Sequence, residues 1–578
     1  MQNYKRLNTL IGWAVFAIAA VVYTLTAEPT ASFWDCGEYI ATSFKLQVGH
    51  PPGAPTFQLF GRFFSLFAFG DVTKVAFMIN MMSVLSSAFT ILFLFWTITH
   101  FAKKLSGGTI DTASKLWTVI GAGVVGALAY TFSDSFWFSA VEGEVYAMSS
   151  MFTALVFWLM LKWEEDADDP RSFRWIILIT FLMGLSIGVH LLNLLTLPAL
   201  VMIYYYRRYE VTKKGIFFAL LISVVLLALM FYMLIPGVVW LAGHFELFFI
   251  NSMGLPFNSG TIIFFTLLIL AFVFGLRWSK RKGRVVVNTI VLSFAFLLIG
   301  YSTFFILIIR SNANTPINEN SPRDAISLLS YLNREQYGET PLITGQYFNA
   351  PLNQSKEWKN ASPIYEKDLE KGKYVVTDPR ENSRPTYNKK FSTFMPRMWS
   401  SQENHHISTY LEWGGIDEKD VYKSVPTTSR GDKIYTQGTP KNPPTFGQNM
   451  RFFFTYQVGH MYFRYFFWNF VGRQNDIQGH GNPTEGNWYC GIPAIDKMHL
   501  GNQEMVPEHM AKNPGNNAFY FLPLILGLIG LFYHLNKHSK DTLVVTLLFL
   551  MTGLAIVVYL NQYPYQPRER DYAYAGSF

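Results

Sequence analysis

Residues 216–240 read IFFALLISVVLLALMFYMLIPGVVW, a stretch without a charged side chain. A helix needs about 20 mainly apolar residues to cross the hydrocarbon of a bilayer, so this stretch decides the class of the fold. Ten similar stretches are spread along the chain. We therefore predict a polytopic α-helical membrane protein with about 11 transmembrane helices, at residues 9–27, 77–99, 116–132, 144–161, 175–189, 191–206, 216–240, 261–277, 286–309, 518–535 and 542–560.

Two of these predictions leave alternatives open. The ranges 175–189 and 191–206 are short and share a tight connection at His190, so they form either two spans or one bent or re-entrant unit. The first range, 9–27, is too long for a signal peptide and is followed by further spans. We interpret it as an uncleaved anchor.

The composition agrees with this class. Of the 578 residues, 50% are hydrophobic and only 15% are charged, against about 25% charged in an ordinary soluble domain. Mean hydropathy is positive, at +0.19. These values exclude a disordered chain, a fibrous repeat and a string of soluble domains. The two cysteines, Cys36 and Cys490, are too few for a disulfide framework or a cysteine-rich metal site, and nothing in the sequence pairs them.

The net charge of +8 reflects topology. If the N-terminus is placed in the cytoplasm, the short outer loops hold only Lys45, Arg62 and Lys74. The cytoplasmic loops and helix ends hold many more basic residues, as the positive-inside rule requires. The inner residues are Lys5, Arg6, Lys103, Lys104, Lys115, Lys162, Arg171, Arg174, Arg207, Arg208, Lys213, Lys214, Arg277, Lys280, Arg281, Lys282, Arg284, Lys537 and Lys540. Because the membrane topology accounts for these basic residues, the net positive charge does not indicate a nucleic-acid partner.

Three outer segments interrupt the helical pattern. Residues 1–309 form the expected transmembrane core, with a first outer loop at 28–74. Residues 310–517 are rich in Asn, Pro, Tyr and Gly, and are long enough for a folded extracytoplasmic α+β domain. Residues 518–578 hold the last two spans and an outer segment, whose ending without a polar tail is compatible with a natural chain that continues.

The first outer loop carries the sharpest candidate site. It reads Phe33-Trp-Asp-Cys-Gly-Glu-Tyr39, so Asp35 and Glu38 share one face of a helical turn. Two such carboxylates suit a general base and a group that orients substrate. The alternative is that a helix N-terminus attracts acids through its dipole. The later Gly49-His50-Pro-Pro-Gly53 stretch favours a shaped site and adds His50.

Further ionisable groups lie at the same side of the predicted spans, where they are costly without a cavity or a partner. Glu142 and Glu144 begin the fourth span, where Glu142 is expected to cap the helix and Glu144 to lie deeper. His190 lies at the hairpin of the fifth and sixth spans, and the alternative to a site role is a hydrogen bond to a carbonyl group.

Arginines on the outer side run against the charge bias. Arg568 and Arg570 follow the last span, and Arg310 opens the large outer segment. A guanidinium matches a phosphate, so a lipid phosphate is a natural partner. An internal salt-bridge cluster with Glu569 and Asp571 is the equal alternative. No HExxH, P-loop, GxSxG or zinc spacing occurs in the sequence.

The ordered combination of these motifs resembles a known family. Its parts are Phe33–Tyr39, Gly49–Gly53, Val141–Tyr146, Gly184–His190 and Pro567–Tyr572. The pattern resembles the membrane-embedded GT-C glycosyltransferases, and more closely the domain-of-unknown-function 2723 family, which is similar to the transmembrane protein 260 O-mannosyltransferases. Members of that group often continue into a long soluble C-terminal part, which this sequence lacks.

The resemblance implies a glycosyltransferase of the bacterial inner membrane with its site on the periplasmic side. A polyprenyl-phosphate donor would pass a sugar, mannose in the family, to Ser or Thr of an exported protein with inversion. Asp35 would deprotonate the acceptor, and Glu38 and Glu144 would hold sugar hydroxyls or orient the acceptor. Arg568 or Arg570 would stabilise the leaving phosphate, with His190 as a further donor. Relatives differ in whether they use a divalent cation.

Two other functions remain as hypotheses. A lipid-linked sugar flippase or transporter would place polar groups near mid-bilayer and would often show repeats, whereas here they cluster at one surface. A structural or assembly protein would use the outer segment 310–517 to bind partners.

Overall fold

The computed structural model describes residues 2–578 and divides them into two units. The first unit comprises residues 1–337, 365–375 and 531–552, and the second comprises 338–364, 376–530 and 553–578. This division differs from the domain boundaries expected from sequence, because residues 310–337 and the hairpin 365–375 pack within the first unit.

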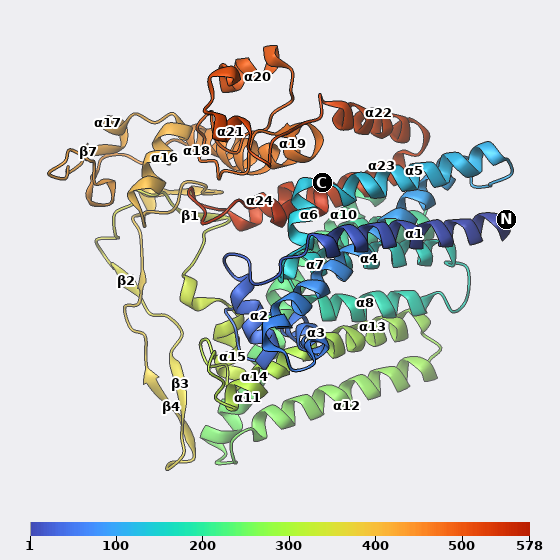
Figure 1. Ribbon diagram of the computed structural model, residues 1–578. Helices are drawn as coiled ribbons and strands as arrows, with labels where there is room; N and C mark the ends of the chain where they lie inside the picture. Colours follow the sequence, from blue (N-terminus) through green and yellow to red (C-terminus); the bar gives the residue numbers. More distant parts are fainter. Residues whose placement is uncertain (1) are drawn as a thin grey trace. The chain divides into compact units, whose positions relative to one another are not determined.

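The first unit is a bundle of helices, of which α1, α4, α8, α12 and α13 have roughly parallel axes (Figure 1). Its helices are α1 Gln2–Leu25, α2 Cys36–Lys45, α3 Pro55–Ser65, α4 Val75–Leu105, α5 Ala113–Thr131, α6 Asp134–Ala140, α7 Val145–Glu165, α8 Phe173–Ile187, α9 Leu197–Arg208, α10 Lys213–Ala228, α11 Ile235–Leu247, α12 Ser259–Arg281, α13 Val285–Tyr301, α14 Phe305–Asn312, α15 Ala325–Leu332 and α23 Ser539–Thr552.

The predicted fold class is confirmed. In the described part of the chain, 8 helices are long and apolar enough to cross a membrane. Three further predicted ranges hold shorter helices, namely α8, α9 and α22 (Leu522–Lys537). The pair around His190 is shorter than expected because α8 ends at Ile187 and a 3-10 turn, Leu191–Thr196, precedes α9.

The stretch 216–240 lies inside a longer helix than the sequence predicts. Helices α10 and α11 join through a π-helical turn, Leu229–Leu234, and continue through a second π-helical turn, Phe248–Ser252. The resulting helix spans Lys213–Ser252, which is 40 residues. Near its end, the buried Glu246 carboxylate accepts hydrogen bonds from the backbone N–H groups of Asn258 and Thr261, at 2.6 and 2.9 Å.

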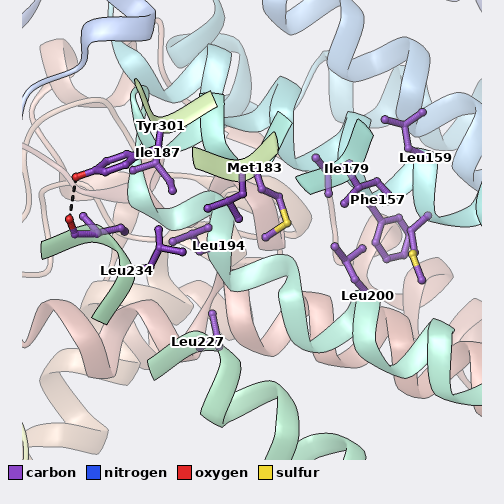
Figure 2. Close-up of a cluster of buried hydrophobic side chains, with 14 of the residues drawn as sticks. Phe157, Leu159, Ile179, Met183, Ile187, Leu194, Leu200, Leu227, Leu234 and Tyr301 are labelled. Carbon is purple, nitrogen blue, oxygen red and sulfur yellow. Dashed lines mark hydrogen bonds between the residues drawn. The ribbon is translucent and has the colours of Figure 1, made fainter. Parts of the chain in front are cut away.

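A large apolar cluster holds the first unit together. Figure 2 shows part of it, with Met183 and Ile187 of α8 among side chains from α7, α9 and α10. Tyr301 of α13 is buried there and donates a hydrogen bond of 2.9 Å from its hydroxyl to the carbonyl oxygen of Ile235. The bond satisfies the one polar atom of an otherwise apolar side chain.

Helices α8 and α13 approach each other closely through two glycines. A Cβ atom on Gly184 would collide with the carbonyl oxygen of Leu297, and one on Gly300 would collide with the carbonyl oxygen of Phe181. Both obstacles are backbone atoms, which cannot rotate away. Small residues at such a contact allow the van der Waals packing that holds membrane helices together.

The second unit combines short helices with small sheets. Its helices are α16 Asn404–Gly414, α17 Glu418–Val421, α18 Phe446–Phe452, α19 Arg464–Phe470, α20 Pro493–Leu500, α21 Glu508–Ala511 and α24 Leu554–Leu560, with α22 crossing the division. The strands are β1 Thr344–Gln346, β2 Trp358–Lys359, β3 Ile364–Asp368, β4 Lys373–Asp378, β5 Arg384–Pro385, β6 Ser392–Phe394, β7 Tyr422–Ser424, β8 Thr439–Pro440, β9 Gly472–Arg473 and β10 Asn517–Ala518, of which β3 and β4 extend into the first unit. They pair as β1–β6, β2–β5, β3–β4, β7–β8 and β9–β10.

The glycine contact predicts a matched pair of stabilities. Gly184→Ala should lower the free energy of unfolding by about 1–3 kcal/mol, the usual cost of overpacking, because α8 and α13 must move apart. Gly121→Ala in α5 is the control, since no described atom lies within 4 Å of its added Cβ. Thermal unfolding of the detergent-solubilised protein measures both. Equal melting temperatures for the two variants would contradict the close contact.

Candidate functional site

Residues 28–74, the predicted first outer loop, hold two short helices joined by a turn. Helix α2 begins at Cys36, directly after Asp35, and α3 begins at Pro55, where proline suits the first turn. Between them, Gly53 has a φ of 78°, and its N–H donates to the carbonyl oxygen of His50 at 3.0 Å. The Tyr331 hydroxyl donates to the carbonyl oxygen of Gly49 at 2.6 Å, which fixes the turn from a third element, α15.

Glu38 and His50 form the central contact of this segment. The Glu38 carboxylate accepts a hydrogen bond of 2.6 Å from the backbone N–H of His50, and the His50 Nδ1 lies 3.1 Å from both carboxylate oxygens. Gly49 makes room for this approach, because a Cβ there would lie 2.6 Å from Glu38 Oε1. The motif that contains Glu38 and the Gly49–Gly53 motif are thus in direct contact.

The two groups shift each other's titration. Burial favours the neutral form of Glu38, but the hydrogen bonds and charge of His50 outweigh it and lower the carboxyl pKa. Burial likewise opposes the charged form of His50, and Glu38, helped by Asp35, outweighs it and raises the imidazole pKa. Both shifts favour the ionic form of the pair, with Glu38 as carboxylate and His50 as imidazolium.

Asp35 has a different environment from Glu38. It is exposed and occupies the N-cap position of α2, yet its side chain makes no capping hydrogen bond with the described residues. Its carboxylate lies with the Glu38 carboxylate and the His50 ring, whose ligand atoms are all within 4.8 Å of one another. Asp35 is thus a carboxylate open to solvent, held next to an ion pair.

Glu142 and Glu144 are both buried, with exposures of 2% and 4%. Glu142 accepts a hydrogen bond of 2.7 Å from the Ser32 hydroxyl, and the Cys36 Sγ lies 3.5 Å from the same oxygen. The expectation that Glu142 caps the helix is wrong, because α7 starts at Val145 and places Glu144 at the N-cap position. The Glu142 side chain instead contacts Ser32 and Cys36, at the start of α2.

His190 lies at the start of the 3-10 turn that follows α8. Its Nδ1 accepts a hydrogen bond of 3.2 Å from the N–H of Leu192, so the ring proton is on Nε2. Burial, reinforced by repulsion from Arg334, lowers the pKa of His190 to about 4. The Tyr146 ring lies 5.1 Å away. His190 is therefore a neutral N–H donor.

Three further residues join this cluster that the sequence interpretation did not select. Burial raises the pKa of Tyr39 well above its usual value, and the carboxylates of Glu144, Asp35 and Glu38 add to the shift. The exposed Arg334 guanidinium repels the charged forms of both His50 and His190. Burial and the nearby Glu38 raise the pKa of Glu319. No local signal in the sequence singles out Arg334 or Glu319, which are brought in by the fold of residues 310–337.

Arg310 has a different position from the one its predicted role implies. Its guanidinium donates hydrogen bonds to the carbonyl oxygens of Leu46 and Lys45, at the C-terminal end of α2. This contact satisfies carbonyl groups that a helix end leaves open. Arg310 therefore fastens α2 to α14, and its binding of substrate stays a prediction.

Arg568 and Arg570 belong to the second unit. The Arg568 guanidinium lies over the Tyr572 ring at 4.2 Å, and Arg570 donates to the side-chain oxygen of Gln566 at 3.0 Å. Glu569, which the sequence grouped with these arginines, forms a 2.6 Å ion pair with Arg464. The motif thus contains an internal salt bridge, but with a partner about a hundred residues away.

Two groups of side chains have the composition of a cation site. One contains Asp35, Glu38 and His50, and the other contains the buried Cys36, Glu142 and Glu144. Carboxylate oxygens suit Mg²⁺ or Mn²⁺, and a thiolate favours Zn²⁺. In the first group a cation would compete with the Glu38–His50 pair. Cys36 and Cys490 are both buried thiols.

The comparisons with known proteins cover the part of the chain that holds the acidic cluster. Residues 35–213 match the family described as the Protein O-mannosyl-transferase TMEM260 N-terminal domain. Residues 338–454 match a family of unknown function, DUF8416. The first match begins at Asp35 and includes Glu38, His50, Glu142, Glu144 and His190, but not the three predicted arginines.

Two curated relatives carry the same name. The chain is 30% identical over 175 residues to Protein O-mannosyl-transferase TMEM260 of Mus musculus, which is 30% of this chain and 22% of the relative. It is 28% identical over 145 residues to Protein O-mannosyl-transferase tmem260 of Dictyostelium discoideum, which is 25% of this chain and 16% of the relative. The matched part is thus less than a quarter of either relative. The expected similarity to these proteins is confirmed over this region.

The Glu38–His50 pair predicts a measurable titration. The pKa of His50 should lie above its ordinary 6.5, and in Glu38→Gln it should fall below the wild-type value, because burial and Arg334 then dominate. Stabilisation from His50 is complete below pH 6.5 and is lost as pH rises through the raised pKa. Stabilisation from Glu38 is complete above pH 4.5 and is lost as pH falls through the lowered pKa.

Histidine ring NMR of selectively labelled protein measures this titration. Asp71→Asn is the control, because Asp71 lies in an exposed turn of the same outer segment. It should leave the His50 curve unchanged. If the His50 titration curve of Glu38→Gln were identical to that of the wild type, the Glu38–His50 pair would be ruled out.

Proposed function

We propose that the protein is a membrane-embedded glycosyltransferase that moves mannose from a polyprenyl-phosphate donor to Ser or Thr of exported proteins. The observation that carries this proposal is the exposed Asp35 carboxylate beside the Glu38–His50 pair, inside the region similar to the TMEM260 O-mannosyl-transferases. The name of the relatives supports the sugar and the protein acceptor. The donor lipid and the inversion of the anomeric centre are parts of the proposal.

Asp35 is the better general base of the two catalytic candidates. The Glu38 carboxylate already accepts hydrogen bonds from His50, and its lowered pKa makes it a weak proton acceptor. Asp35 is open to an incoming hydroxyl group, and its position at the start of α2 is fixed by the Glu38–His50 contact. Glu38 and His50 then act as positioning residues that hold the base.

The reaction needs one base and compensation for the leaving phosphate. Asp35 takes the proton of the Ser or Thr hydroxyl, whose oxygen attacks C1 of the sugar while the bond from C1 to the lipid phosphate breaks. Attack from the opposite face inverts the anomeric centre. Positive charge near the departing phosphate stabilises the transition state. Glu144 would orient a sugar or acceptor hydroxyl.

Within the first unit, Arg334 is our candidate for this compensation. It is exposed and close enough to influence both His50 and His190. His190 supplies a neutral Nε2–H as a second donor. Arg568 and Arg570 remain further candidates from the second unit. A guanidinium can donate two hydrogen bonds to one phosphate, which favours an arginine in this role.

The same geometry argues against a transporter. Transporters bind their substrates near the bilayer midplane. Here the acidic cluster lies in the loops after α1 and before α7, at the ends of helices that could cross a membrane. With the N-terminus in the cytoplasm, this end faces the periplasm of a bacterial inner membrane.

Asp35→Asn should reduce mannosyl transfer to an acceptor peptide by about 10²–10⁴-fold, the usual contribution of a general base. The amide keeps the shape of the side chain, so the melting temperature and donor binding should stay unchanged. Asp71→Asn is the matched control and should keep full activity. If Asp35→Asn transferred mannose at the wild-type rate, Asp35 would not be the general base. If the wild-type protein transferred no sugar from any lipid-phosphate donor, the proposed function would be wrong.

Arg334→Gln should lower kcat by roughly 10²-fold, as loss of one transition-state donor does. It should also raise the pKa of His50, because the positive charge of Arg334 opposes the imidazolium. Lys74→Gln, which removes an exposed charge from the same unit, should change neither. Steady-state transfer assays with varied donor separate kcat from KM. A wild-type kcat in Arg334→Gln would assign the role to other cations.

A further inference from the structure

A cavity lined by charged and aromatic residues lies at the opposite end of the bundle from the acidic cluster. Its volume is about 440 Å³, within the usual range for ligand sites. It is formed by the N-terminal turns of α1, the last turns of α4 and α7, and the loop after α4. The residues around it include Tyr4, Lys5, Trp96, Lys103, Trp158 and Lys162.

The cavity gathers positive charge. Lys5, Lys103 and Lys162 line it, against the single carboxylate of Glu165, with which Lys162 forms an ion pair at 2.8 Å. His100 lies between Glu164 and Glu165, with its Nε2 and Nδ1 each 3.3 Å from a carboxylate oxygen, so these two acids are already engaged and Lys5 and Lys103 supply the net positive charge of the cavity. An occupant with negative charge is therefore favoured.

The aromatic side chains that line the cavity are of the kinds enriched at membrane interfaces. Trp96 and Trp158 are stacked with ring centroids 5.0 Å apart, and Tyr4 contributes a third aromatic ring. Tryptophan and tyrosine gather where hydrocarbon meets head groups. The helices that supply these rings, α1, α4 and α7, are all long and apolar enough to cross a membrane.

We propose that this cavity binds the head group of an anionic phospholipid, with its phosphate at Lys5 and Lys103. The shared chemistry is a phosphate ester, which a lipid or a soluble glycerol phosphate could supply. The stacked tryptophans and the membrane-crossing helices favour the lipid. In the proposed topology, the lipid lies in the cytoplasmic leaflet.

This site is separate from the proposed catalytic one. The cavity contains Lys5 and Asn8 near the start of α1, and Asp35 follows the end of the same helix. A helix of 24 residues is about 36 Å long at 1.5 Å per residue. A lipid in this cavity therefore cannot be the donor that reacts at Asp35.

Native mass spectrometry of the detergent-solubilised full chain tests the proposal. We expect phosphatidylglycerol to be retained over phosphatidylcholine with the same acyl chains. Lys5→Gln combined with Lys103→Gln should weaken this binding by roughly 30-fold, since each interfacial lysine contributes about a factor of five. The single variant Lys103→Gln should weaken it by about fivefold, and provides the test if the double variant does not fold.

Controls separate the site from general charge. Lys213→Gln with Lys214→Gln removes two exposed lysines at the start of α10 and should change binding by less than about twofold. Lys5→Arg with Lys103→Arg should retain binding. Asp35→Asn should bind phosphatidylglycerol like the wild type, so the site can be tested even if the proposed transfer activity fails.

Three results would overturn the proposal. The first is equal retention of phosphatidylglycerol and phosphatidylcholine. The second is equal weakening by the lysine pair in the cavity and the pair at α10. The third is binding of sn-glycerol 3-phosphate as tight as that of the lipid, which would assign the cavity to a soluble phosphate ester.

Discussion

The geometry of the acidic cluster depends on the carboxylate of Glu38, which His50 holds through its backbone N–H and its ring. This contact joins the first turn of α2 to the turn that precedes α3. Asp35, one turn earlier, is then presented to solvent at a fixed place. A flexible loop could carry the same residues, but it would not hold a base within the narrow tolerance that proton transfer requires.

Much of the fold could be predicted because a bilayer restricts what a chain can do. Without water in the hydrocarbon, each backbone N–H and C=O must bond within its own segment, so long apolar runs such as 216–240 become helices. The positions of the helices around Val75–Leu105 and Ser259–Arg281 therefore follow closely from the sequence. The bounds of the two short helices on either side of His190 are predicted less closely by the sequence, because the ends of such helices depend on contacts with neighbouring helices.

The candidate site could be predicted in part, for a related reason. Asp35, Glu38 and His50 lie in one short outer loop, so their proximity is largely a local matter. Arg334 and Glu319 reach the same cluster from a segment almost three hundred residues later, which no local pattern reveals. The burial of Glu142 and the role of Arg310 at the end of α2 also depend on contacts between distant elements.

The helix Lys213–Ser252 is longer than one crossing of a bilayer needs. Forty residues of helix measure about 60 Å along the chain, roughly twice the thickness of the hydrocarbon layer. Pro236 and the two π-helical turns are features at which helices bend, so the extra length can be taken up by a change of direction. The end of the helix is joined to the hairpin 365–375, where Asn251 bonds to Tyr374 in both directions, at 2.8 and 2.9 Å. The hairpin therefore keeps a fixed orientation relative to the last turn of this helix.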